Sequence, residues 1–119
     1  MLLQIISPEE LETLIYGGQV RNMYSEQWLS IVRMLPCMYP GCNVRRAGTA
    51  HHLYNWGLAL TCSDYLTIPL CWTHHVWSNM PVQQMDNDEF EKIMKMEKAD
   101  AARRIYTVNV NILQRGDLV

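Results

Sequence analysis

The chain has 119 residues, of which 49% are hydrophobic and 18% charged, and its formal net charge is −2. This length suits one compact domain with a modest core and excludes a second full domain. The negative net charge argues against strong nonspecific attraction to nucleic acid, but it does not exclude nucleic-acid binding, which depends on how the charge is distributed.

The apolar runs all fall short of the roughly 18–20 residues needed to cross a bilayer, and the first residues lack the basic flank of a signal peptide. We therefore expect a cytoplasmic protein without a membrane partner. Cysteines seldom form disulfides in a reducing cytosol. The four cysteines and four histidines all lie between positions 37 and 75, so metal ligation is the better expectation for them.

Helices are expected before this metal-rich centre. Ser7, followed by a proline and two acidic residues, predicts a helix over residues 8–16 that Gly17 ends. A second helix with an apolar face begins after Ser25, and Pro36 ends it.

The centre itself consists of loops, turns and short strand-like runs such as residues 66–70. Beyond it, the composition of residues 86–106 predicts one helix, and residues 107–119 carry no clear signal. The chain is thus interpreted as a single domain with a helical part, a metal-rich core, and a C-terminal helix with its tail, over residues 1–36, 37–80 and 81–119.

Two pairs of residues have the spacing of zinc ligands: Cys37-x4-Cys42, with a Pro-Gly turn inside it, and Cys71-x2-His74. Zinc prefers four such ligands in a tetrahedron, and the Cys3His set is typical of a structural site that contributes folding free energy. A lone cysteine is more often a buried apolar thiol. That is our interpretation of Cys62, with replacement of Cys42 as a ligand as its lesser alternative.

The remaining histidines suggest a second site. Neighbouring residues of a strand point to opposite sides, so one histidine of His51-His52 can hold a metal while the other stays free as a general base. If residues 72–80 form a helix, His75 and Asn79 share a face and can bind a common ion, while His74 points toward the zinc. A divalent cation stabilises the charge that develops on a cleaved phosphodiester. A lone histidine is more often a surface or core residue, but two pairs make that interpretation weak for all four.

Order and spacing together resemble a known family, the HNH nucleases of phages and in particular the Ref-like recombination-associated nucleases. The resemblance covers roughly residues 28–80 and rests on Leu35-Pro36-Cys37-x4-Cys42, Ala50-His51-His52, Ser63-Asp64 and Ile68-Pro69-Leu70-Cys71-x2-His74-His75-x3-Asn79. It implies an α+β fold with a small zinc-stapled ββα-metal (HNH, or His-Me finger) core flanked by N- and C-terminal helices. It also implies metal-dependent hydrolysis of DNA in the bacterial host, linked to recombination or DNA processing.

The same resemblance implies a role for each residue. His51 and His75 would hold the catalytic ion, His52 would be the general base, and the two cysteine-containing pairs would hold the structural zinc. Asp64 stands near the position of the family's central asparagine and replaces it. Asn79 stands where relatives often have a histidine and is a weaker ligand for a borderline metal, which favours Mg²⁺ or Mn²⁺ over Zn²⁺ or Ni²⁺ as the catalytic ion.

Contacts to DNA are expected from Arg45 and Arg46, which lie between the first cysteine pair and the histidine doublet. A solvated loop is an equally good interpretation of this pair. Trp56, Trp72 and Trp77 have rings that can stack on unpaired bases, but in so small a domain we expect them in the core.

Two alternatives belong to other classes. A nucleobase deaminase requires a His-x-Glu motif, and Leu53 stands at the position of the glutamate, which rules it out. A non-catalytic zinc module would bind DNA or a recombination or host defence protein. The low positive charge and the missing central asparagine favour this module, whereas the presence of His51, His52 and His75 disfavours it.

Overall fold

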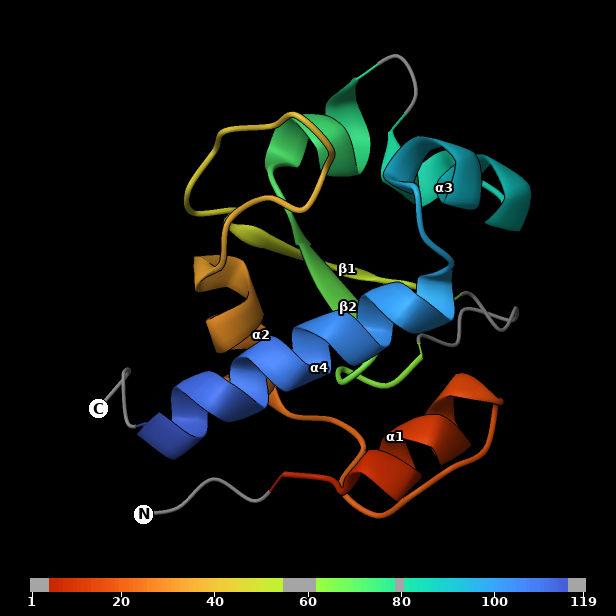
Figure 1. Ribbon diagram of the computed structural model, residues 1–119, viewed down its shortest axis with the longest axis vertical. Helices are drawn as coiled ribbons and strands as arrows, with labels where there is room; N and C mark the ends of the chain where they lie inside the picture. The colour runs from red at the N-terminus through yellow and green to blue at the C-terminus, as the bar shows by residue number, and fades with distance from the viewer. Residues whose placement is uncertain (1–4, 55–61, 79–80, 116–119) are drawn as a thin grey trace.

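The computed structural model describes residues 5–54, 62–78 and 81–115. The elements follow the order α1 (Pro8–Ile15), α2 (Glu26–Met34), β1 (Thr49–His52), β2 (Thr67–Leu70), η1 (Thr73–Trp77), η2 (Val82–Gln84), α3 (Asn87–Met94) and α4 (Lys98–Arg115). Figure 1 shows α4 crossing the middle of the molecule, with α1 on one side of it and η1 and α3 on the other. In these ranges no helix has both the length and the apolar character that a membrane crossing requires. The fold is a small α+β arrangement.

The two strands form an antiparallel pair in which Thr49 lies opposite Leu70 and His52 opposite Thr67. All four residues of β2 are buried, and the strand ends one residue before Cys71. The strand β2 leads almost directly into η1, a π-helix of five residues. A histidine-bearing strand, its partner and a histidine-bearing helix therefore follow one another along the chain.

The two N-terminal helices begin where their caps predict. The Ser7 hydroxyl accepts a hydrogen bond from the Glu10 backbone, and the Glu10 carboxylate accepts one from the Ser7 backbone, at 3.1 and 2.9 Å. The Ser25 hydroxyl caps α2 by accepting from the Trp28 backbone at 3.1 Å. At its other end, α2 stops at Met34, because the residue before Pro36 takes an extended backbone conformation. Both predicted helices are confirmed.

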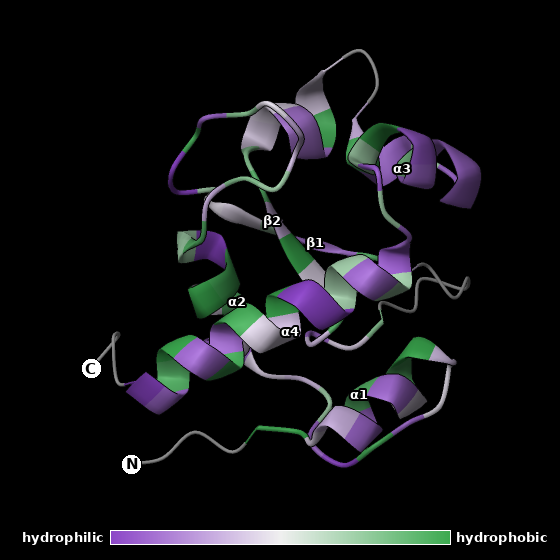
Figure 2. Cartoon of the chain, viewed as in Figure 1, coloured by the Kyte–Doolittle hydropathy of each residue, from purple (hydrophilic) through white to green (hydrophobic). Residues whose placement is uncertain are grey.

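A continuous hydrophobic core joins α1, α2, the strands, α3 and α4. Trp28 is fully buried in it, with its ring 4.7 Å from the ring of Tyr65 and 5.8 Å from that of Tyr106, measured between centroids. The Tyr106 hydroxyl donates to the Ile6 carbonyl at 2.6 Å, which ties α4 to the segment before α1. Figure 2 shows hydrophilic and hydrophobic residues interspersed along α4, as expected of a helix with one face on the core.

The single helix predicted over residues 86–106 is wrong. The chain forms α3, turns at Lys95 in the left-handed conformation with φ 63°, and starts again as α4, which continues to Arg115 through most of the tail. The two helices bury different faces, so their apolar positions do not follow one helical period. The later part of α4 was not predicted as a helix because the apolar pattern is interrupted there: the polar residue Asn109 occupies a fully buried position.

We expect Lys95→Gly to stabilise the protein by about 0.5–1 kcal/mol. The left-handed backbone costs a residue with a side chain about 1–2 kcal/mol, which exceeds the added entropy of an unfolded glycine, about 0.5–1 kcal/mol. The matched control is Lys92→Gly at an exposed position inside α3, which should destabilise by about 1 kcal/mol. Thermal unfolding of the two variants measures both changes in stability. If the helix instead continued through position 95, both variants would lose the same free energy of unfolding.

Candidate functional site

Four metal-ligating side chains converge beside the strand pair. The ligand atoms of Cys37, Cys42, Cys71 and His74 all lie within 4.8 Å of one another. The His74 Nδ1 atom is 3.3 Å from the Cys71 sulfur and 3.8 Å from the Cys37 sulfur. A tetrahedral zinc site with bonds of about 2.0–2.3 Å has ligand–ligand distances of about 3.3–3.8 Å. The four residues can therefore hold one metal ion, as their spacing predicts, and the set suits zinc.

Local backbone structure places each of these ligands. Cys42 follows a turn in which its N–H donates to the Tyr39 carbonyl at 3.0 Å and Gly41 takes φ 82°. The segment after α2 is tied to the sheet because the Met38 N–H donates to the Pro69 carbonyl at 2.8 Å. The Cys71 N–H donates to the Cys37 sulfur at 3.3 Å, so the two halves of the cluster also contact each other directly.

The surroundings of the cluster restrain its histidine and bury two of its cysteines, Cys37 and Cys71. The Tyr39 ring stacks on the His74 imidazole at 3.9 Å between centroids with an interplanar angle of 1°. Burial raises the pKa of the Cys37 thiol to about 11. An ion bound here must therefore displace a proton from this sulfur, as metals do at buried thiol ligands.

The fourth cysteine lies outside this group of ligands. Cys62 is 1% exposed, and its thiol contacts the Leu66 carbonyl at 3.7 Å. The group that converges contains Cys42 and does not contain Cys62. The interpretation of Cys62 as a core thiol is therefore confirmed, and its alternative role as a substitute for Cys42 is wrong.

His51 and His75 form a second group of histidines, in which His75 directly follows the cluster residue His74. His51 on β1 is buried, and its ring lies 5.1 Å from that of His75 on η1 in an edge-to-face arrangement. His74 thus lies in the Cys3His cluster, whereas His75 lies outside that cluster beside His51. Burial, followed by the positive charges of His75, Lys98 and His52, lowers the pKa of His51 to about 3. Burial also lowers the pKa of His75. Both imidazoles are therefore neutral near pH 7, the state in which a histidine binds a metal.

Hydrogen bonding also determines which nitrogen of His75 is free. The Thr49 hydroxyl donates to the Leu70 carbonyl, so it can only accept from the Nδ1 atom of His75, 3.0 Å away. His75 therefore carries its proton on Nδ1 and leaves the lone pair of Nε2 available to an ion. An outer partner that fixes the tautomer in this way is typical of metal-binding histidines.

His52 has a different partner from its neighbour. The Nε2 atom of His52 lies 2.9 Å from the Asp64 Oδ1 atom. The Asp64 Oδ2 atom accepts from the Ser25 N–H at 2.7 Å, and the Asp64 carbonyl accepts from the Thr67 hydroxyl at 2.7 Å. A carboxylate only accepts hydrogen bonds, so the proton of His52 is on Nε2 and Nδ1 is the basic nitrogen. The two sequence-predicted residues His52 and Asp64 are thus in direct contact.

Other predicted residues have different outcomes. Arg45 and Arg46 are exposed in the loop between the cluster and β1. Trp72 and Trp77 are 56% and 76% exposed, so their predicted place in the core is wrong. Asn79, predicted as a metal ligand, and Trp56 lie outside the described residues.

Three residues near the histidines were missed in the sequence. Thr49 stands two residues before His51, a spacing that places both on one face of a strand, and this signal was available. Ser25 was recognised only as a helix cap. Lys98, at the start of α4, is half-buried with its ammonium group 5.9 Å from the Tyr54 ring and 5.8 Å from the Phe90 ring. No local pattern pointed to it.

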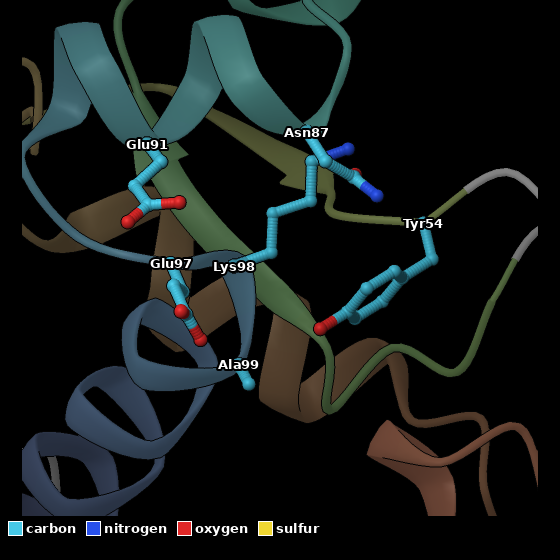
Figure 3. Close-up of a pocket in the computed structure, with 6 residues that line it drawn as sticks. All are labelled: Tyr54, Asn87, Glu91, Glu97, Lys98 and Ala99. Carbon is cyan, nitrogen blue, oxygen red and sulfur yellow. The ribbon is translucent and has the colours of Figure 1, made fainter.

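A cavity of about 270 Å³ lies beside Lys98 (Figure 3). Its lining combines the phenol of Tyr54, the ammonium group of Lys98 and the carboxylates of Glu91 and Glu97. Burial lowers the pKa of Lys98. None of the predicted catalytic or metal-binding residues lines this cavity, although Lys98, which lines it, is also one of the charges that lower the pKa of His51.

No family model matches the chain, and neither a curated protein nor a solved structure matches it. The function must therefore be argued from the site itself.

Purified protein is expected to carry one zinc ion per chain in the Cys3His cluster. Cys71→Ala should abolish zinc binding and cooperative unfolding, because it removes a ligand from a site that contributes to folding free energy. Cys62→Ala is the control, since it removes a buried thiol that is no ligand and should leave the zinc content unchanged. Elemental analysis of the three proteins decides the matter, and zinc-free parent protein would refute the structural-site assignment.

Proposed function

We propose that the protein is a metal-dependent DNA endonuclease of the HNH type, with a ββα-metal core formed by β1, β2 and η1. The observation that carries this proposal is the adjacency of two histidine arrangements. One is the pair of neutral histidines, His51 and His75, and the other is the hydrogen-bonded pair of His52 and Asp64. A one-metal nuclease requires these two parts, a site for a divalent cation and a base for the attacking water.

The proposed general base is His52. Its Nδ1 atom takes a proton from water as the water oxygen bonds to the phosphorus, the bond from phosphorus to the leaving oxygen breaks, and that oxygen takes a proton from solvent. Asp64 holds the imidazole in the required tautomer and stabilises the positive charge that the ring gains, a role that carboxylates have beside many catalytic histidines. The Ser25 N–H in turn holds the second oxygen of Asp64, so the base is oriented by the cap of α2.

The proposed cation site consists of His51 and His75, with Asn79 as a further ligand. A bound Mg²⁺ or Mn²⁺ stabilises the negative charge that builds on the phosphate during cleavage. The donor set supports this assignment in two ways. His51 is neutral because it is buried, and the lone pair of His75 Nε2 is free because Thr49 holds the proton on Nδ1. Two imidazoles also allow a softer ion such as Zn²⁺ or Ni²⁺.

The Cys3His cluster has a structural role in this proposal. A zinc ion there would hold the start of η1 against the segment after α2, and η1 carries His75 one residue after the ligand His74. A closed tetrahedral set leaves no open position for substrate. The cluster therefore positions the histidine site and takes no part in the reaction.

A non-catalytic zinc module that binds DNA or a recombination or host defence protein is the second candidate. It is favoured by the completeness of the Cys3His cluster, whereas the described part of the chain provides only two ligands for the cation site. Against it stands the specific pairing of His52 with Asp64, which a zinc scaffold does not require.

Replacing His52 and His51 by alanine should separate the two roles. The His52→Ala protein should lose about 10²–10⁴-fold in cleavage rate, the usual contribution of a general base, and should stay inactive at every metal concentration. The His51→Ala protein loses a ligand, so its activity should return in part as Mg²⁺ or Mn²⁺ is raised. A metal titration of plasmid and oligonucleotide cleavage compares the variants side by side.

Both variants should retain zinc and most of their DNA affinity, because neither residue belongs to the Cys3His cluster or to the arginine pair. Normal cleavage by the His52→Ala protein, or no cleavage by the parent with any divalent ion, would refute the nuclease and favour the non-catalytic module.

Asp64 is proposed as a positioning residue, and Asp64→Ala should lower the cleavage rate by roughly tenfold or more while leaving the zinc content intact. Asp64→Asn should retain more activity than Asp64→Ala, because an amide oxygen can still accept the hydrogen bond of His52. Both variants lose the same charge, but asparagine keeps one acceptor oxygen for the two donors, His52 and the Ser25 N–H, so their difference in rate measures one retained hydrogen bond. Equal rates for parent and both variants would assign Asp64 to capping its turn and α2 only.

A further inference from the structure

The helix η1 exposes two tryptophans in a protein whose other described tryptophan is fully buried. Trp72 is 56% exposed and Trp77 is 76% exposed, whereas Trp28 has no exposed surface. None of the residues of η1 is buried. An exposed indole ring leaves a large apolar surface in water and contributes no hydrophobic free energy to folding. Two such rings at one short helix therefore indicate a binding surface.

The two tryptophans lie at the two ends of η1. A π-helix repeats by bonds between residues five apart, and the Ser78 N–H donates to the Thr73 carbonyl at 2.8 Å. Trp72 is the N-cap residue of η1 and Trp77 is its last residue, and the exposed Thr73 follows Trp72 directly. We call these three residues the tryptophan face. The intervening His74 and His75 contact the cysteine cluster and His51.

The stretch of sequence that contains this face is basic. Between residues 27 and 85 the sequence contains a single acidic residue, Asp64, which is bonded to His52. Arg33 in the same stretch pairs with Glu26 at 2.6 Å. Arg45 and Arg46 are exposed, and their loop follows Cys42, whose sulfur lies within 4.8 Å of the ligand nitrogen of His74 on η1. The net charge of −2 therefore arises elsewhere in the chain, mainly from the acidic residues of α1, α3 and the start of α4.

We propose that the tryptophan face stacks on unpaired bases, with Arg45 and Arg46 meeting the adjoining phosphates, so that the substrate is single-stranded or locally unpaired DNA. This inference rests on the proposed nuclease function and specifies its substrate class. Stacking requires that a base leave its duplex, since only an unpaired base offers its ring face, and exposed aromatic rings beside cations are the usual means of binding single strands. A protein partner would also use exposed tryptophans, but it would not account for the arginines and histidines around them.

The test is a binding measurement with zinc-loaded protein in buffer without Mg²⁺ or Mn²⁺, so that no cleavage is needed. Fluorescence anisotropy compares a labelled mixed-sequence oligonucleotide with the duplex of the same sequence. We expect the single strand to bind at least tenfold more tightly, and Trp72→Ala and Trp77→Ala each to weaken its binding about tenfold. Trp77→Phe should retain part of the affinity because it keeps a ring.

The control variant is Tyr16→Ala, which removes an aromatic ring that is 81% exposed at the end of α1, away from the metal sites. Its affinity for the single strand should equal that of the parent. The inference would be overturned if duplex and single strand bound equally, or if both tryptophan variants bound as the parent does. It would also be overturned if neither DNA bound, and that outcome would point to a protein partner. If the single strand binds as expected but no ion supports cleavage, the tryptophan face is supported as a binding surface and the nuclease is refuted. If the tryptophan variants cleave duplex DNA at the parent's rate, the nuclease is supported and the tryptophan face is refuted.

Discussion

Four side chains from distant parts of the sequence meet at the Cys3His cluster, and the candidate histidine site depends on that convergence. Cys37 and Cys42 belong to the segment after α2, while Cys71 and His74 belong to the end of β2 and to η1. The segment after α2 contains no helix or strand up to β1, and η1 is short and buries none of its residues. A bound ion can contribute the free energy that holds them in place, which a small core cannot supply alone.

Much of this arrangement could be predicted from the sequence because the signals are local. A helix cap is visible within four residues, as at Ser7 and Ser25, and ligand spacing such as Cys71-x2-His74 indicates a metal site without knowledge of the fold. The separation of His74 from His75 followed from the same local geometry. Neighbouring residues on a helix point in different directions, so His75 was expected to point away from the cluster that His74 joins.

The features that were missed depend on contacts between distant residues or on the absence of burial. Asp64 is separated by 39 residues from Ser25, whose N–H it accepts. Lys95 breaks the predicted C-terminal helix because α3 and α4 must bury different faces, and only the tertiary packing decides this. Tryptophan is a large apolar residue that is usually buried, so the sequence favoured the core for Trp72 and Trp77. Their exposure follows from the position of η1 at the outside of the fold.

The two candidate metal sites share the backbone of one helical turn, since their ligands His74 and His75 are consecutive residues. An agent such as EDTA that strips the cysteine-bound ion would release His74 and, with it, the peptide unit that orients His75. Inhibition by a chelator would then look the same whether or not a separate ion takes part in the chemistry. The rate at which activity returns on adding Mg²⁺ alone, compared with Zn²⁺ followed by Mg²⁺, is the informative observation, because only the second sequence rebuilds both sites.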